Sequence, residues 1–370
     1  MDKKNRSYKI ALVGDCLAGG GAEKMHAALS EIFTADGIEV HNIIIYDWVT
    51  YPYAGKLHNL GKMPNVTKLD KVKKVYALRK YMQKQHFDGV VDFRYRVNHI
   101  NEFLIGHFAY NCPKIYTVRS GIIEYYIPKN RIVRTIIYNN AIAIQTLSDR
   151  ITEVVQKYFK MPVKTIYNPF DFEKIKQLSQ LFVPQENDYI VAVGRMNDDV
   201  KQFDKLIEAY SNSVLVAKNI KLLILGEGIL MEGLVKLVLE KQLVDKVIFK
   251  GYQRNPHPYQ KKALFSVLSS RNEGFGNVLV ESLALGTPVI SFDCFAGPSE
   301  IIQHEQNGLL VEDQNIEKLT EAMNLMIEDQ ELYQKCKQNA SNSVQKFSAA
   351  IIGKQWLDFL YQNINYNDKH

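Results

Sequence analysis

The sequence predicts an α/β protein with two parallel sheets, because short apolar runs alternate with longer amphipathic stretches along the whole chain. Its 370 residues are enough for two domains. A composition of 46% apolar and 23% charged residues is that of a globular protein, and no run approaches the 18 apolar residues of a membrane span. We therefore expect two α/β domains and no membrane-spanning helix.

The predicted strands form two sets of five. They lie near residues 8–14, 40–46, 89–93, 114–118 and 141–146 in the first half, and near 189–194, 221–226, 246–251, 264–269 and 287–292 in the second. Helical stretches separate most of them, so each half is predicted to be a Rossmann-like domain.

Asn168 and Pro169 mark the predicted boundary, because proline lacks a backbone donor and restricts the residue before it. We expect an N-terminal domain at 1–168 and a C-terminal domain at 169–347. An amphipathic helix within 348–370 is expected to cross back to the first domain.

The basic charge lies in the first half of the chain. Residues 1–180 hold 27 Lys and Arg against 16 Asp and Glu, or +11, whereas residues 181–370 hold 19 against 24, or −5, which together give the net +6. This asymmetry predicts that the first domain meets an anionic partner. The apolar stretch near the start is too short for a signal peptide, so a cytoplasmic location is expected.

The four cysteines are far apart and form no CxxC pair, which argues against a zinc ribbon or a dithiol redox site. We interpret them as buried small apolar side chains.

Three glycines, Gly19, Gly20 and Gly21, follow the first predicted strand and open the first helix. They would let backbone amides approach a ligand closely at a helix N-terminus. The spacing differs from G-x-G-x-x-G, which disfavours NAD binding. A flexible turn without a ligand is the alternative interpretation.

A second candidate site follows the strand at 189–194. Arg195 leaves the carboxyl end of that strand and Lys201 is expected to begin the next helix, so both cations would face the crevice where open α/β sheets bind ligands. Arginine suits bidentate contact with phosphate and lysine supplies a point charge. Taken alone, the segment favours the alternative of a solvated arginine at the strand end and an exposed lysine on the helix.

The segment 269–291, SSRNEGFGNVLVESLALGTPVIS, carries two glutamates around a glycine-flanked turn. The helix after the turn would present its N-terminal amides to a diphosphate. Carboxylates suit neutral hydroxyl donors instead, so we expect Glu281 to bind a ribose diol and Glu273 a sugar beyond the phosphates. The alternative is a capping Glu273 and a solvent-facing Glu281.

The ordered motifs of the chain resemble those of glycosyltransferase family 4, the retaining GT-B enzymes of bacterial capsule, O-antigen and lipid-linked oligosaccharide synthesis. The resemblance covers nearly the whole chain. It rests on GGAE (20–23), VGR with a following lysine, LILGEG (223–228), EGFGNVLVE with its E-x7-E spacing, and GPSEII followed by NGLLV within 297–311.

The resemblance implies two Rossmann-like domains facing a cleft, with a nucleotide-sugar held mainly by the C-terminal one. It also implies transfer with retention of anomeric configuration and no metal, and no DxD metal motif is evident. It makes Glu273, Arg195 and Lys201 the catalytic residues. The residues implied to bind the donor are Gly20, Gly21, Arg195, Lys201, Glu273, Phe275, Gly276, Asn277 and Glu281.

One position departs from the family. Many relatives have a histidine near the reacting sugar after the strand equivalent to 114–118, whereas this chain has Arg119 and Ser120. The relatives that extend polyprenyl-diphosphate lipids suggest an anionic acceptor headgroup, for which Arg94, Arg96, Arg119 and Ser120 are the candidate ligands.

The predicted function is transfer of a hexose or N-acetylhexosamine from a UDP-sugar to a hydroxyl of a glycan acceptor, which we expect to be a lipid-linked saccharide. A GT-B epimerase or phosphorylase and a catalytically idle partner subunit are the alternatives. Nucleic-acid binding is disfavoured, because no basic and aromatic module of a known kind is present. Contact with an anionic membrane surface, at the inner face of the cell membrane, is predicted from 68–84, with seven Lys or Arg against one Asp, and from 122–138. The alternative is a solvated helix face at 68–84 and a buried strand-helix segment at 122–138.

Overall fold

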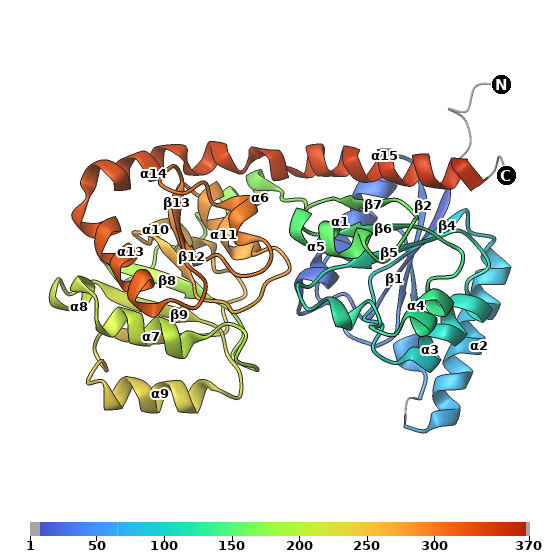
Figure 1. Cartoon of the computed structure of the whole chain (residues 1–370), viewed down its shortest axis with the longest axis horizontal. Helices are drawn as coiled ribbons and strands as arrows, with labels where there is room; N and C mark the ends of the chain where they lie inside the picture. Colours follow the sequence, from blue (N-terminus) through green and yellow to red (C-terminus); the bar gives the residue numbers. More distant parts are fainter. Residues whose placement is uncertain (1–7, 65, 368–370) are drawn as a thin grey trace. The chain divides into compact units, whose positions relative to one another are not determined.

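The computed structural model describes residues 8–64 and 66–367 and divides the chain into two compact units (Figure 1). Unit 1 consists of Met1–Pro169 and Ala349–His370, and unit 2 of Phe170–Ser348. Each unit contains one parallel sheet with helices packed on it, so the prediction of two Rossmann-like α/β domains with parallel sheets is confirmed. None of the described helices combines the length and apolar character that crossing a lipid bilayer requires.

Unit 1 is built on a seven-stranded sheet with the strand order β3-β2-β1-β4-β5-β6-β7. Its strands are β1 (Lys9–Gly14), β2 (Glu39–Ile44), β3 (Lys56–Asn59), β4 (Gly89–Asp92), β5 (Lys114–Val118), β6 (Ala141–Thr146) and β7 (Val163–Thr165). Its helices are α1 (Gly21–Ala35), α2 (Lys68–Gln85), α3 (His99–Leu104), α4 (Arg131–Ile137), α5 (Asp149–Gln156) and α15 (Ala349–Asn367), with short helical turns at Leu60–Lys62, Ile105–Ala109 and Ile123–Tyr125.

Unit 2 has a six-stranded sheet with the order β10-β9-β8-β11-β12-β13. Its strands are β8 (Tyr189–Val193), β9 (Lys221–Leu225), β10 (Val247–Gly251), β11 (Ser266–Leu268), β12 (Val289–Phe292) and β13 (Gly308–Val311). Its helices are α6 (Phe172–Leu178), α7 (Phe203–Ser211), α8 (Val214–Ala217), α9 (Met231–Glu240), α10 (His257–Lys262), α11 (Asn277–Ala284), α12 (Pro298–Ile301), α13 (Ile316–Glu328) and α14 (Gln330–Ser343), and Gln345–Phe347 forms a 3₁₀ turn.

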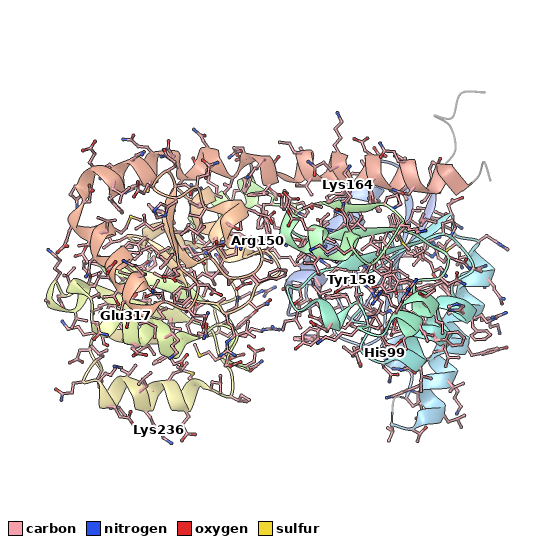
Figure 2. The ribbon with its side chains drawn as sticks, in the orientation of Figure 1. His99, Arg150, Tyr158, Lys164, Lys236 and Glu317 are labelled. Atoms are coloured by element: carbon pink, nitrogen blue, oxygen red, sulfur yellow. The ribbon has the colours of Figure 1, made fainter. Side chains whose placement is uncertain are left out.

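The last helix, α15, belongs to the core of unit 1. Its apolar face, which includes Ile352, Trp356 and Leu360, is buried together with residues of β1 and α1. The Trp356 ring meets Phe33 of α1 at 6.5 Å between ring centroids. Figure 2 shows Lys164 of β7 near α15, where its ammonium lies 5.9 Å from the centre of the Phe359 ring.

Parallel pairing brings the carboxyl ends of several strands of unit 1 together. β4 pairs with β1 on one side and with β5 on the other, so Gly14, Asp92 and Val118 end neighbouring strands. Open parallel α/β sheets bind their ligands at the carboxyl ends of the strands. The loops that leave these three strands carry the candidate residues of unit 1.

Candidate functional site

The candidate site of unit 2 begins in the loop between β8 and α7. Arg195 follows β8 and is exposed. Backbone hydrogen bonds fix the loop at Met196, whose N–H donates to Glu227 at 2.9 Å and whose carbonyl accepts from Leu230 at 2.9 Å. Lys201 was expected to begin the next helix, but α7 begins at Phe203, so Lys201 lies in the loop. The helix starts later because Gln202 adopts a left-handed conformation with φ 47°.

Lys201 and Glu273 form an ion pair in this structure. The Lys201 ammonium contacts Glu273 Oε1, and the side chains are 18% and 12% exposed respectively. Ser270 donates its hydroxyl to the same carboxylate oxygen at 2.7 Å. The structure therefore brings together two of the predicted catalytic residues. Ser270, which was not among the predicted site residues, positions Glu273. The sequence could have indicated it as the polar residue directly after the strand predicted near 264–269.

Helix α11 begins at Asn277 without a side-chain cap. Gly276 precedes it with φ 96°, a conformation that favours glycine, and as the N-cap residue it has no side chain with which to cap the helix. The amides at a helix N-terminus favour an anion. Glu281 lies further along α11 and is buried, which contradicts the alternative of a solvent-facing Glu281.

Phe275 was expected to lie along the donor. Its side chain is instead buried inside unit 2, with ring centroids 5.1 Å from Phe347 and 6.4 Å from Phe170. The side chain of Phe275 therefore fixes the loop, and its contribution to a donor site would come from the main chain.

In unit 1, the glycine loop joins β1 to α1. Gly19 has φ 82° and faces the Trp48 ring, which a Cβ would approach to 2.9 Å. Gly20 is the N-cap of α1 and makes no side-chain cap, and Gly21 is the first residue of the helix. The first-turn amides of a 15-residue helix thus lie at the carboxyl end of β1.

Arg94 and Arg96 were expected to bind an anionic acceptor. Both lie inside unit 1 and are neutralised there. Arg94 bonds to Asp92 at 2.7 Å and to Glu102 at 3.0 Å, and Tyr110 donates to Asp92 at 2.8 Å. Burial opposes ionisation of Asp92, but Arg94 and Arg96 outweigh it and lower the pKa of that carboxyl.

Arg96 is buried among three tyrosine rings, and its Nε donates to Tyr138 at 3.0 Å. The assignment of Arg94 and Arg96 as acceptor ligands is therefore replaced by a structural one, in which they hold the loop after β4. The sequence reasoning missed Asp92 and Glu102, whose signal was a carboxylate at the end of one strand and another in the following helix.

Arg119 and Ser120 follow β5. Arg119 is also buried, but its hydrogen bonds go to the neutral side chains of Gln145 and Asn168. The Ser120 hydroxyl accepts from the Ile122 amide at 3.1 Å and thereby forms a local turn. The described residues contain no group of three or more His, Cys, Asp and Glu side chains that could hold a metal ion.

Residues 173–343 match the family model described as "Glycosyl transferases group 1". The matched residues all lie within unit 2, which spans Phe170–Ser348. This match falls on the unit that holds Arg195, Lys201, Glu273 and Glu281.

Relatives named as glycosyltransferases align with 95% of this chain. It is 28% identical to the N-acetylgalactosamine-N,N'-diacetylbacillosaminyl-diphospho-undecaprenol 4-alpha-N-acetylgalactosaminyltransferase of Campylobacter jejuni, over 95% of this chain and 99% of that protein. It is 23% identical to the amylovoran biosynthesis glycosyltransferase AmsD of Erwinia amylovora, over 95% and 99% of the two chains.

Solved structures share the fold. Anabaena Alr3699/HepE in complex with UDP and glucose superposes with a TM-score of 0.77 at 19% identity, over 96% of this chain and 100% of that one. TarM superposes with a TM-score of 0.76 at 15% identity, over 96% and 99%.

Proposed function

We propose that this chain is a retaining glycosyltransferase that moves a hexose or N-acetylhexosamine from a UDP-sugar to a hydroxyl of a lipid-linked glycan. The observation that carries the proposal is the ion pair of Lys201 and Glu273 in the loop that leads to the N-terminus of α11, in a unit that matches the model of group 1 glycosyl transferases. The Campylobacter relative acts on a diphospho-undecaprenol saccharide, and a structural neighbour was solved with UDP and glucose.

In this proposal the diphosphate is bound by cations and amides. Arg195, Lys201 and the α11 amides meet the charge that grows as UDP leaves, and no metal ion is required. Glu273 turns from Lys201 to the hydroxyls of the sugar, and Glu281 accepts from the ribose. The acceptor hydroxyl then attacks the anomeric carbon from the face that UDP leaves. The new glycosidic bond forms as the bond to the diphosphate oxygen breaks, and the departing UDP accepts the hydroxyl proton.

Thermal unfolding with UDP in the presence of a chelator tests this proposal. A ligand that binds only the native state stabilises it, by about 2.7 kcal/mol at 100 times the dissociation constant. We expect UDP to raise the unfolding temperature without divalent metal, and Arg195→Gln to reduce the effect. Stabilisation that depends entirely on magnesium or manganese would contradict the metal-independent site.

The catalytic claim needs a separate assay. UDP-sugars are incubated with the protein and a membrane extract as the acceptor source, and UDP release is measured. Acceptor-dependent release supports transfer. Conversion of the UDP-sugar without acceptor would support an epimerase, and UDP binding without any turnover would support an idle partner subunit.

We further propose that unit 1 contacts an anionic membrane surface through the outer face of α2. Leu69, Val72 and Tyr76 are exposed on this helix at positions that share one face, beside the exposed Lys71 and Lys73. The neighbouring elements are α3, the turn at Ile105–Ala109 and α4 (Figure 1). They carry the exposed apolar side chains of Ile100, Phe103, Phe108, Ile132 and Ile136. Mixed basic and apolar surfaces suit anionic headgroups.

Sedimentation with anionic and neutral vesicles at low salt tests the membrane proposal. Lys74 is buried and bonds to the Ile45 carbonyl, so the test variant replaces Lys71, Lys73 and Lys80 by Gln. At about 1 kcal/mol for each lysine, we expect roughly 100-fold weaker binding to anionic vesicles. The control replaces three exposed lysines of unit 2, including Lys236 (Figure 2). Equal binding to both kinds of vesicle would remove the membrane claim alone.

A further inference from the structure

Buried arginines follow two neighbouring strands of unit 1, and they differ in how their charge is met. Arg94 and Arg96, in the loop after β4, lie 2.7 Å and 4.0 Å from oxygens of Asp92. Arg119 follows β5 and is 6% exposed. Among the described residues, no carboxylate lies within ion-pair distance of Arg119.

The Arg119 guanidinium is held by neutral groups. Its Nη1 donates to Gln145 Oε1 at 3.1 Å and its Nη2 donates to Asn168 Oδ1. The Gln145 amide nitrogen donates to the Thr146 and Ile166 carbonyls, which turns the Gln145 oxygen toward Arg119. Nε has no hydrogen-bond partner within the part of the chain that the structure describes.

An aromatic stack supports the same cation. The Cζ atom of Arg119 lies 5.7 Å from the centre of the Phe93 ring, and Phe93 stacks on His26 at 5.2 Å with 8° between the planes. An aromatic face attracts a cation through the ring quadrupole. The stack holds the guanidinium in one orientation without neutralising its charge.

Keeping an unneutralised cation in this position opposes folding. Burial lowers the pKa of Arg119 to about 10, yet the group remains charged at neutral pH. Glu23 opposes this shift through space, but it forms no ion pair with Arg119. A buried charge without an ion-pair partner is destabilising, whereas a neutral side chain would fill the space without that penalty. Such a charge is characteristic of a binding site that is completed by an anionic ligand.

Arg119 also lies at the carboxyl ends of the strands of unit 1, where open parallel α/β sheets bind their ligands. It is the first residue after β5, next in the sheet to β4, which pairs with β1 and its glycine loop. Loops at the carboxyl ends of neighbouring parallel strands form the ligand crevice of open α/β sheets. The neutral partners of Arg119 and its position after β5 therefore both favour binding of an anionic ligand.

We propose that Arg119 is the anion receptor of unit 1 and binds an oxygen of a phosphate group, with Gln145 and Asn168 as positioning residues. This inference rests on the proposed function, which supplies two sources of that chemistry: the diphosphate of the UDP-sugar donor and the diphosphate of a lipid-linked acceptor.

Asn168→Asp is the central test because it supplies the missing carboxylate with almost no change of shape. The new carboxylate pairs with Arg119 and competes with a bound phosphate. Arg119→Gln removes the charge and keeps a polar side chain. Arg79→Gln, which removes one cation from α2 of the same unit, is the matched control.

Calorimetry with UDP and with farnesyl diphosphate, a short lipid diphosphate, separates the two sources. We expect Asn168→Asp and Arg119→Gln each to weaken the binding of at least one probe by 10- to 100-fold, as for the loss of one charge-assisted hydrogen bond. A loss of affinity for UDP alone assigns Arg119 to the donor site. A loss of affinity for farnesyl diphosphate alone assigns it to the acceptor site. Arg79→Gln is expected to leave both affinities within about threefold.

The inference is overturned if both affinities are unchanged in Asn168→Asp and Arg119→Gln while Arg195→Gln weakens UDP, a result that leaves the proposed function intact. It is also overturned if Asn168→Asp raises the unfolding temperature but alters neither affinity, because Arg119 would then have a structural role only. If the wild-type chain binds no UDP, the proposed donor fails, and the farnesyl diphosphate measurements alone decide the role of Arg119.

Discussion

His26 is a fully buried titratable side chain whose environment opposes its protonation. Its Nε2 lies 3.1 Å from Asn42 Oδ1, and Nδ1 has no partner among the described residues. A Cβ at Gly14 would lie 2.4 Å from Nδ1, so glycine at the end of β1 leaves the space that the ring occupies. Burial is the main cause that lowers the pKa of His26 to about 4.

This pKa predicts a loss of stability in mild acid. The unfolded state takes up a proton near pH 6.5 and the folded state only near pH 4, so the stabilisation is complete above pH 6.5 and is lost as the pH falls to 4. The loss from this group is roughly 3 kcal/mol. His41 and His58 shift in the same direction, so the measurement must isolate His26.

The contribution of His26 is isolated by comparing the wild type with His26→Gln. The free energy of unfolding in urea is measured for both proteins at pH 7 and pH 4.5. We expect the variant to lose less stability between the two pH values than the wild type does. His304→Gln, at an exposed histidine, is the control and should keep the wild-type difference. An unchanged difference in His26→Gln would contradict the assignment.

Residue types at strand ends were predictable from the sequence, but their partners were not. The arginines after the strands at 89–93 and 114–118 could be selected as candidate ligands from their positions. Whether each is neutralised depends on Glu102 in α3 and on Gln145 in β6, which approach only in the folded unit. The same explains why the contact between Ser270 and Glu273 was missed.

At the scale of elements, the two glutamates of the candidate site lie in different parts of the chain, one in the loop from β11 to α11 and one in α11 itself. Glu273 lies in the loop, tied to Lys201, whereas Glu281 is buried within α11. In the proposed function the first meets the sugar and the second the ribose. The two positions should therefore respond differently to truncation.

We expect Glu273→Ala to abolish most transfer but to leave UDP affinity nearly unchanged, because its partner is the sugar. Glu281→Ala should weaken UDP by about ten- to a hundred-fold, as for the loss of one charge-assisted hydrogen bond. Calorimetry with UDP measures both variants. Ser270→Ala, which removes only the hydroxyl that positions Glu273, should lower transfer less than Glu273→Ala. Equal losses of UDP affinity in the two glutamate variants would refute this division of roles.

The strands that the sequence predicted have long apolar runs, whereas those it missed are short or partly polar. The interior strands β1, β8 and β9 appear as continuous apolar segments because both of their faces are covered. The missed strands β3 and β13 each have four residues and lie at an edge of their sheets. β3 is KLHN, whose polar residues resemble those of a loop, and β13 is GLLV, which is apolar but too short for its pattern to identify a strand.

At the scale of the whole molecule, unit 1 is completed by a distant part of the chain. The amphipathic pattern of 348–364 predicts a helix that packs on another layer, but a pattern does not specify its partner. The structure packs α15 on residues of β1 and α1. Tyr361 also donates to Asp36 at 2.6 Å, at the C-terminal end of α1. Folding of unit 1 therefore depends on residues more than 300 positions from its first strand.

Trp356→Ala tests this dependence. The Trp356 side chain is fully buried in the core of unit 1, and replacing a buried tryptophan by alanine typically lowers the free energy of unfolding by about 3 to 5 kcal/mol. We expect a loss of this size. Unfolding in urea is measured by far-UV circular dichroism, because the variant retains only the exposed Trp48 as a tryptophan fluorophore. Ile351→Ala, at an exposed position of the same helix, should change stability by no more than about 0.5 kcal/mol. Similar values for the two variants would mean that α15 does not contribute to the core of unit 1 in solution.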